Sequence, residues 1–330
     1  MHHPSETDIV SRVDDIRSKV ARVKESIAGA IFGQDSVIEL VLVNILSGGH
    51  ALLIGVPGLA KTSLVEALGA ALGLEAKRIQ FTPDLMPSDI VGTEVLEERA
   101  GTRSFRFVKG PVFAQLLMAD EINRASPKTQ SALLQAMQEH QVTYAGQNYI
   151  LPSPFFVLAT QNPLEQEGTY PLPEAQLDRF LLQVDITYPN AAAERRMLFA
   201  TTGIEERRVQ QVLTAEEVIA AQRLVRQIPA GDSVVNAILK LVRSARPNTA
   251  EAAPRINELV AWGPGPRASQ AMMLTVRARA LLDGRFAPSI DDVVALAKPV
   301  LRHRMALTFT ARTENIAVDQ VIDGLVAQVQ

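Results

Sequence analysis

The sequence predicts an α/β protein in which a parallel sheet carries helices on both faces and is followed by a smaller, all-helical domain. Three observations support this prediction. Short apolar runs alternate with amphipathic stretches in the first part of the chain, as buried strands and their covering helices do. A loop rich in small residues joins one of these runs directly to a helix. After about residue 189 the strand signals fade and helix-capping sequences follow one another.

The candidate strands are short apolar runs of the kind that is buried on both faces of a sheet. They lie at residues 51–54, 78–81, 115–119 and 155–159. The amphipathic stretches have apolar residues at helical spacing. They predict helices at residues 5–30, 35–46, from about 61 to 72, and 129–139. Ser126 is the expected N-cap of the last of these, with Pro127 in its first turn.

Two inserts interrupt this alternation, at residues 91–108 and 142–151. In the first, residues 104–107 alternate like a strand and Gly101 supplies a turn. The second has the pattern of a hairpin that turns at Gly146. From the residues alone, both are surface hairpins that cover the edge of the sheet.

The second part of the chain contains capped helices. Thr214 and Glu217 form a capping box, and Ser289 opens a further helix in the same way. Helices are predicted at residues 214–227, 232–246 and 268–283 and after Ser289. The boundary falls between residues 189 and 210, and we divide the chain into residues 1–200 and 201–330.

Composition excludes several classes of protein. Lys and Arg number 33 and Asp and Glu 36, and the net charge of −3 gives no global attraction to nucleic acid or to an anionic membrane. The lack of cysteine excludes a disulfide framework and a thiolate metal site. No apolar stretch approaches the ~20 residues of a membrane helix. We therefore expect a soluble, cytoplasmic protein that does not act on nucleic acid.

The strongest chemical signal is the loop at residues 55–62, between the run 51–54 and the next helix. Small residues in such a turn let backbone N–H groups surround a phosphate at the positive end of a helix. Lys61 is expected to reach the outer phosphates and Thr62 to bind Mg²⁺. Ala60 stands where the general pattern has a second glycine, and its methyl group narrows the allowed backbone angles. The alternative is a glycine-rich turn with an incidental lysine.

Polar groups follow two of the other candidate strands. Asp120 and Glu121 come after the run 115–119, at the strand end where open α/β sheets bind ligands. Asp120 is expected to hold Mg²⁺ through water, and Glu121 to polarise the attacking water. Asn162 follows the run 155–159 and can orient that water or contact the terminal phosphate. Its alternative is an ordinary turn before proline.

In this order, the segments resemble the AAA+ ATPases and, within them, the MoxR family. The resemblance covers nearly the whole chain. It is carried by Phe32-Gly33-Gln34 and by residues 55–62, 81–89, 120–125, 159–163, 174–180 and 263–268. Alanine at position 60 is a usual variant in this family. The resemblance implies an AAA+ P-loop sheet with a helical lid, which hydrolyses ATP with Mg²⁺ in a ring of subunits, usually a hexamer.

The resemblance also implies roles for individual residues. Asn162 is similar to the sensor of the terminal phosphate, Arg179 to the arginine finger that reaches the neighbouring subunit's nucleotide, and Arg267 to the lid arginine that contacts the nucleotide in cis. Lys61 and Glu121 complete the catalytic set. The implied nucleotide-binding residues are Phe32, Gly33, Gln34, Gly55, Val56, Pro57, Gly58, Leu59, Ala60, Lys61, Thr62, Ser63 and Arg267.

Each of the two arginines also has an alternative in which it takes no part in the reaction. Arg179 could form an ion pair with Asp178 or Glu174, and Arg267 could be a solvated arginine at a helix start. The charged cluster at residues 302–304 is expected to be solvated or to lie in an interface.

Three functions are open at this point. The leading one is remodelling of a partner protein, or insertion of a metal or cofactor into it, driven by ATP hydrolysis. The family implies that this partner has a von Willebrand factor A domain and that the two inserts face a pore. A second is a nucleotide-gated scaffold with little turnover, which the intact pair of Asp120 and Glu121 disfavours. A third is a DNA-translocating motor, which the net charge and the few aromatic residues disfavour.

Overall fold

A computed structural model describes residues 6–99, 102–165, 167–203 and 209–329. Within these residues, five parallel strands form the central sheet in the order β2-β5-β8-β1-β9. Their bounds are β1 Ala51–Ile54, β2 Ala76–Gln80, β5 Leu116–Asp120, β8 Phe156–Gln161 and β9 Leu182–Asp185. The predicted strands are therefore confirmed to within a few residues at each end.

β9 escapes sequence reasoning. It is an edge strand next to β1, and only Leu182 and Val184 of its residues are buried. Two alternating apolar residues are too weak a pattern to identify a strand. The helix that follows, α7 (Ala191–Thr201), is likewise not predicted.

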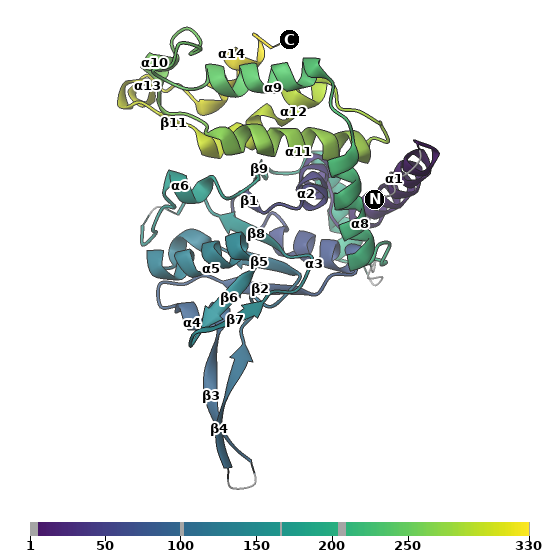
Figure 1. Ribbon diagram of the computed structural model, residues 1–330, viewed down its shortest axis with the longest axis vertical. Coiled ribbons are helices and arrows are strands. Elements are labelled where there is room, and N and C mark those ends of the chain that lie inside the picture. Colours follow the sequence, from purple (N-terminus) through teal and green to yellow (C-terminus); the bar gives the residue numbers. More distant parts are fainter. Residues whose placement is uncertain (1–5, 100–101, 166, 204–208, 330) are drawn as a thin grey trace.

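Helices cover both faces of the sheet (Figure 1). Those before the lid are α1 Glu6–Ala28, α2 Asp35–Ser47, α3 Lys61–Leu72, α4 Pro87–Val91, α5 Pro127–Glu139, α6 Glu174–Leu177 and α7, with the 3-10 turn η1 Ile122–Arg124. The expected N-cap of α5 is confirmed, because Ser126 Oγ accepts a hydrogen bond from the Thr129 N–H.

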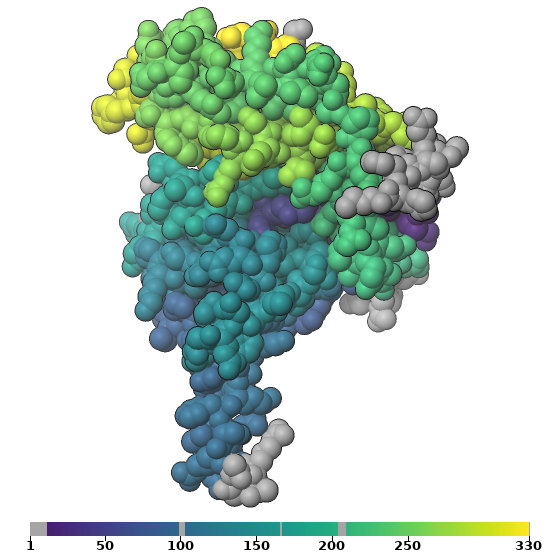
Figure 2. All heavy atoms as spheres, in the orientation of Figure 1, coloured from purple at the N-terminus to yellow at the C-terminus, as the bar shows by residue number. Residues whose placement is uncertain are grey.

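Both inserts are antiparallel hairpins. The first consists of β3 (Gly92–Arg99) and β4 (Thr102–Lys109) and projects far from the body of the molecule (Figure 2). Its base is held by Phe107, whose ring stacks on Tyr149 at 4.2 Å between centroids. Tyr149 lies on β7 (Gln147–Ile150), which pairs with β6 (Gln141–Tyr144). The turn expected at Gly101 lies outside the described residues.

The lid follows the sheet domain and is helical, apart from one short antiparallel pair. Its elements are α8 Ala215–Gln227, α9 Asp232–Ser244, α10 Ile256–Leu259, β10 Val260–Trp262, α11 Pro266–Leu282, α12 Ile290–Leu301, η2 Arg302–Arg304, β11 Ala306–Leu307, α13 Phe309–Thr313 and α14 Val318–Val326. The predicted helical lid is confirmed. The short pair of β10 and β11 was not predicted, because a pairing between segments distant in sequence leaves no local signal. The division after residue 200 remains a prediction.

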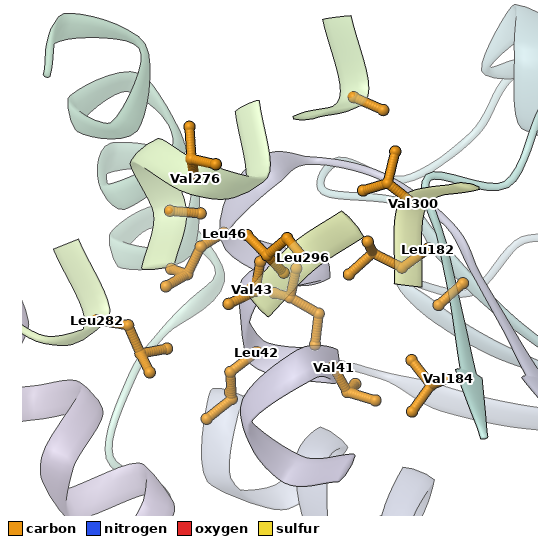
Figure 3. Close-up of a cluster of buried hydrophobic side chains, with 14 of the residues drawn as sticks. Val41, Leu42, Val43, Leu46, Leu182, Val184, Val276, Leu282, Leu296 and Val300 are labelled. Atoms are coloured by element: carbon orange, nitrogen blue, oxygen red, sulfur yellow. The ribbon is translucent and has the colours of Figure 1, made fainter. Parts of the chain in front are cut away.

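One apolar core joins the lid to the sheet domain. In Figure 3, Val41, Val43 and Leu46 of α2 lie among side chains of β9, α11 and α12. Leu182 and Val184 are fully buried there. A lid packed in this way fixes where the start of α11 lies relative to the sheet.

No helix in the described part of the chain is both long and apolar enough to cross a membrane.

Candidate active site

The loop at residues 55–62, here called the phosphate loop, connects β1 to α3 at the carboxyl edge of the sheet. Gly58 has φ +83°, and a Cβ there would meet no described atom within 4 Å. Gly55 is needed for close approach, because its Cβ would lie 2.9 Å from the carbonyl oxygen of Ile186. Ala60 is the N-cap of α3 and adopts the left-handed conformation at φ 54°. The alanine therefore does reach the backbone conformation that glycine would favour.

The loop fits a phosphate. None of the described side chains caps the first turn of α3, so its N–H groups are available to an anion. Gly58 leaves the space over the loop open, and Pro57, Ala60 and Ser63 are exposed. Leu59 is instead buried against the core, while Val56 is half-buried, and these side chains anchor the loop from below.

Lys61 lies across the phosphate loop. Its Nζ donates a 2.6 Å hydrogen bond to the carbonyl oxygen of Gly55. Burial lowers the pKa of the Lys61 ammonium, and the negative charges of Asp120, Glu121 and Glu165 oppose this shift. The lysine is thus placed between the loop and a group of carboxylates.

Asp120 ends β5 and is fixed on both of its oxygens. Oδ1 accepts a 2.5 Å hydrogen bond from Thr160 Oγ1 on β8. Oδ2 accepts hydrogen bonds from Nε and Nη2 of Arg78 on β2, at 3.2 and 2.6 Å. The register explains this arrangement, since Gln80 pairs with Asp120 and Ala119 with Ala159. The neighbouring strand ends therefore meet at the acidic residue.

Glu121 follows Asp120 with a left-handed backbone at φ 55°. Its N–H donates to Thr160 Oγ1 at 2.8 Å. Its Oε2 accepts hydrogen bonds from Gln80 Nε2 at 2.7 Å and from Arg124 Nη1 at 3.0 Å. The carboxylate on which water activation would depend is thus held by neutral and cationic donors.

Thr62 and Asp120 fit a magnesium ion that is shared with phosphate oxygens. No group of three or more His, Asp or Glu suited to a metal occurs among the described residues. A hydroxyl, one carboxylate, waters and phosphate oxygens are nevertheless the ligand set that Mg²⁺ accepts, because it keeps several of its waters. Mg²⁺ would therefore be held together with the nucleotide rather than alone.

Asn162 lies just beyond β8 at the same edge and is 5% exposed. Its Oδ1 accepts a hydrogen bond from the Leu164 N–H at 3.1 Å. That bond has the form expected of an ordinary turn, and it fixes the amide plane. Nδ2 is the side-chain donor that this bond leaves for a ligand.

Residues 32–34 pack beside the phosphate loop. Gln34 Nε2 donates to the carbonyl oxygen of Thr187 at 2.8 Å. A Cβ on Gly33 would lie 2.5 Å from Cβ of Ala193, so this contact requires glycine. The Ile186 N–H in turn bonds the carbonyl oxygen of Ile54 at 2.7 Å, which connects this segment to the loop.

Arg179 and Arg267 lie together at a different place. Arg179 Nη1 donates to the carbonyl oxygen of Leu134 at 3.0 Å, rather than forming the ion pair considered for it. Arg267 is 54% exposed, and its Nη1 lies 3.7 Å from Asp178 Oδ2. The two arginines line a pocket of about 150 Å³, here called the arginine pocket, whose residues are His50, Met137, Gln138, Asp178, Arg179 and Arg267.

The arginine pocket lies at the amino edge of the sheet, opposite the phosphate loop. His50 directly precedes β1, and Asp178 and Arg179 precede β9. The phosphate loop begins where β1 ends, about 13 Å of strand away. The contact in cis expected of Arg267 stays a prediction, and in this structure Arg267 lies away from the phosphate loop of its own chain. The reason is the docking of the lid on α2 and β9, which holds the start of α11 over the amino edge.

Several residues of the site escaped sequence reasoning: Arg78, Gln80, Arg124, Thr160 and Glu165. Arg78 and Gln80 alternate on β2, which was a signal that they share a face beside Asp120. The others become partners of the acidic pair only through the fold.

Comparisons with known proteins identify the family of this chain. A family model described as "ATPase family associated with various cellular activities (AAA)" matches residues 50–182, and one described as "AAA lid domain" matches residues 252–325. Chaperone MoxR1 of Mycobacterium tuberculosis is 41% identical over 91% of this chain and 78% of its own length. The uncharacterised protein YeaC of Bacillus subtilis is 39% identical over 96% of both chains.

A further relative is the protein MoxR of Methylorubrum extorquens, which is 31% identical over 89% of both chains. Among solved structures, a crystal structure from Cytophaga hutchinsonii, described only as a candidate ATPase, superposes with a TM-score of 0.90. It is 36% identical and covers 97% of both chains. With the phosphate loop, the acidic pair and the lid in one order, this chain is a member of the MoxR family of AAA ATPases.

Proposed function

We propose that this ATPase hydrolyses Mg²⁺-bound ATP at a site completed between two subunits of a ring, and that hydrolysis remodels a partner protein. One observation carries the proposal: the phosphate loop and the acidic pair lie at one edge of the sheet, while the arginine pocket lies at the other. A site whose parts lie on opposite edges of one chain is incomplete until a second copy supplies the missing edge.

At the carboxyl edge, the chain binds ATP and activates water. The N–H groups at the start of α3 and the Lys61 ammonium hold the phosphates, once Lys61 exchanges its bond to Gly55 for a phosphate oxygen. Thr62 and Asp120 hold Mg²⁺, which neutralises phosphate charge when it is bound. Glu121 accepts the proton of the attacking water, and Asn162 Nδ2 orients that water or the terminal phosphate.

At the amino edge, the chain serves its neighbour. Arg179 and Arg267 present two guanidinium groups at one pocket, which suits the charge that develops on a transferred phosphoryl group. Repeating this heterologous contact around a closed ring gives every subunit one complete site. We propose a hexamer, the ring that the family resemblance implies.

The partner is inferred from a named relative, from the exposed hairpin and from the family resemblance. Chaperone MoxR1 is named as a chaperone, which favours a client protein. The projecting β3–β4 hairpin carries Leu96 and Phe105 directly opposite each other, at 55% and 71% exposure. Exposed apolar pairs of this kind are suited to contact another protein. We propose a client with a von Willebrand factor A domain, into which a metal or cofactor is inserted, on the family resemblance alone.

Mixed rings test whether the site is shared. Glu121→Gln subunits bind ATP and retain both arginines, whereas Arg179→Ala/Arg267→Ala subunits retain Glu121 and lack both. Steady-state hydrolysis is measured for the wild type across a range of protein concentrations, for each variant alone, and for the two variants mixed. We expect wild-type turnover per subunit to rise with concentration, both variants to be inactive, and the mixture to recover part of the activity.

The outcomes separate the possible functions. A mixture as inactive as its components would mean that the arginines act on their own chain's nucleotide. A wild type that binds ATP without turnover at any concentration would favour the nucleotide-gated scaffold. Retention on DNA that weakens with salt would favour the DNA motor. For the client, ATP-bound Glu121→Gln rings should retain a protein with a von Willebrand factor A domain and release it when Leu96 and Phe105 are both changed to serine.

A further inference from the structure

Two of the three residues of η2 in the lid are buried, in a cluster that was expected to be solvated or to lie in an interface. Arg304 is 2% exposed and His303 is 5% exposed, although both stand in an Arg-His-Arg sequence. A buried guanidinium is costly unless every N–H group finds a partner. The contacts of Arg304 therefore indicate what its burial achieves.

All five N–H groups of Arg304 have acceptors. Nε donates to Asp178 Oδ1 at 2.8 Å. Nη2 donates to the carbonyl oxygens of Phe180, at 2.7 Å, and Asp178, at 3.4 Å. Nη1 donates to the carbonyl oxygens of Leu181, at 3.1 Å, and Val300, at 2.7 Å. With the exception of Val300, these acceptors belong to residues 178–181 of the sheet domain. His303 Nε2 also bonds the carbonyl oxygen of Phe180 at 2.9 Å.

Residues 178–181 are the segment that carries Arg179 into β9. Asp178 divides its carboxylate between two cations, with Oδ1 on Arg304 and Oδ2 facing Arg267 at 3.7 Å. Burial lowers the pKa of the Arg304 guanidinium, and the Asp178 carboxylate opposes that shift. The Asp178 carboxylate thus lies between a buried cation, Arg304, and an exposed cation, Arg267.

We propose that Arg304 is a positioning residue, which through Asp178 and its backbone aims Arg179 and Arg267 at the ATP of the next subunit. This inference rests on the proposed function, because it assigns a direction to arginines that act between subunits. Without the guanidinium of Arg304, Asp178 keeps Arg267 as its partner and draws it back from the neighbouring nucleotide. The backbone around Arg179 also loses the donors that hold it.

Two variants separate positioning from stability. Arg304→Met keeps much of the side-chain volume and leaves Asp178 without its buried partner. The double variant Arg304→Met/Asp178→Asn removes the unpaired charge as well, so stability should recover towards the wild type. The backbone of residues 178–181 still lacks the donors of Arg304 in the double variant. We therefore expect its kcat to stay ~10–100-fold below the wild type, the range that misplacement of a catalytic group produces. Its KM for ATP should stay within about twofold, because the phosphate loop is unchanged. Arg304→Lys keeps the positive charge but has fewer hydrogen-bond donors. Its kcat should therefore lie between that of the wild type and that of the double variant.

A matched control is an ion pair of the lid in which the carboxylate is buried and the arginine is partly exposed. Asp292 is 1% exposed and bonds Arg285 at 2.6 Å. Asp292 lies near the C-terminal end of α11, whereas Arg267 lies at its N-terminal end. The helix has 17 residues, so its two ends are about 25 Å apart. Arg285→Met/Asp292→Asn should therefore change stability and leave turnover within about twofold. A comparable loss of turnover in this control would make Arg304 one of several stabilising lid residues.

Mixed rings test whether the defect of the double variant lies in its arginine pocket or in its phosphate loop. The phosphate loop of Arg304→Met/Asp178→Asn subunits is intact, so mixing them with Glu121→Gln subunits should restore turnover. Mixing them with Arg179→Ala/Arg267→Ala subunits should not. Full activity of the double variant alone, or rescue by both partners, overturns the inference while leaving the proposed function in place. Failure of the proposed function appears separately, as an absence of recovery when Glu121→Gln and Arg179→Ala/Arg267→Ala subunits are mixed.

Discussion

Thr160 bonds Asp120 through a hydroxyl that serves both acidic residues of the site. Its Oγ1 donates to Asp120 Oδ1 at 2.5 Å and accepts the Glu121 N–H at 2.8 Å. Thr160 is fully buried, so neither partner can exchange this bond for bulk water. One side chain therefore sets both the orientation of the Asp120 carboxylate and the left-handed turn into Glu121.

Thr160→Val should expose this dependence. The substitution keeps the shape of the side chain and leaves a buried N–H and a carboxylate oxygen without a partner. The expected loss of unfolding free energy is about 1–3 kcal/mol, measured by urea unfolding. Turnover should fall as well, because the hydroxyl that fixes the positions of Asp120 and Glu121 is gone. Thr160→Ser keeps the hydroxyl and should retain most of both properties; equal behaviour of the two variants would contradict the assigned role.

Gly58→Ala should separate folding from nucleotide binding. The alanine meets no described atom within 4 Å, so its cost to folding is the left-handed φ of +83°, about 1–2 kcal/mol. Its methyl group would occupy the open space over the phosphate loop, where ATP is expected to lie. Nucleotide affinity should therefore fall by more than the stability does, as measured by titration with a fluorescent ATP analogue.

Gly146→Ala is the matched control. Gly146 lies in the turn between β6 and β7 with φ +79°, and a Cβ there would likewise meet no described atom within 4 Å. The cost to folding should therefore be similar, while ATP affinity stays at the wild-type level. Loss of affinity in both variants would mean that general destabilisation, rather than phosphate contact, explains the effect.

The sequence predicts those parts of the site that are local. The phosphate loop follows a strand and opens a helix within a dozen residues, so its chemistry can be recognised without the fold. Asp120 and Glu121 are similar, since the end of a buried strand in a parallel sheet predicts the edge at which they lie.

The parts that sequence reasoning missed depend on contacts between distant segments. The edge of the sheet at which Arg267 lies depends on the packing of α11 and α12 on α2 and β9. Arg304 has the local sequence of a solvated cation, and its carboxylate partner Asp178 is 126 residues away. β9 has only alternating Leu182 and Val184 to indicate a strand. In each case, the deciding interaction is tertiary and has no local pattern.

Gln80→Ala should change how Glu121 is held. Gln80 Nε2 donates to Glu121 Oε2, while Gln80 Oε1 accepts from Arg78 Nη2 at 2.7 Å. Removing this donor leaves the Glu121 carboxylate free to accept a hydrogen bond from the attacking water. We therefore expect basal turnover to rise by up to about fivefold, which corresponds to a fall of about 1 kcal/mol in the activation free energy. The measurement is steady-state hydrolysis at saturating ATP. A fall in turnover with unchanged ATP affinity would instead show that Gln80 holds Glu121 in its working position.

Acid should destabilise the protein through His50. The ring is buried, its Nδ1 accepts the Val157 N–H at 3.0 Å, and its Nε2 donates to the carbonyl oxygen of Met137, which lies at 3.2 Å. Burial lowers the pKa of His50 from 6.5 to about 4. Between these values the unfolded chain binds a proton that the folded chain does not. The free energy of unfolding therefore falls as the pH is lowered through this window.

From pH 7 to pH 5, the contribution of His50 should be about 2 kcal/mol, obtained from urea unfolding at both values. His303 acts in the same direction, since burial lowers its pKa as well. The difference in pH dependence between the wild type and His50→Gln gives the contribution of His50 alone, because that variant keeps His303. Burial alone would raise the pKa of the Asp292 carboxylate, but the hydrogen bonds from Arg285 and from the Ser289 N–H outweigh burial and hold this pKa below its usual 3.8. Asp292 therefore titrates only in more acidic solution. An identical pH dependence in His50→Gln and the wild type would mean that His50 has the same pKa in the folded and the unfolded chain.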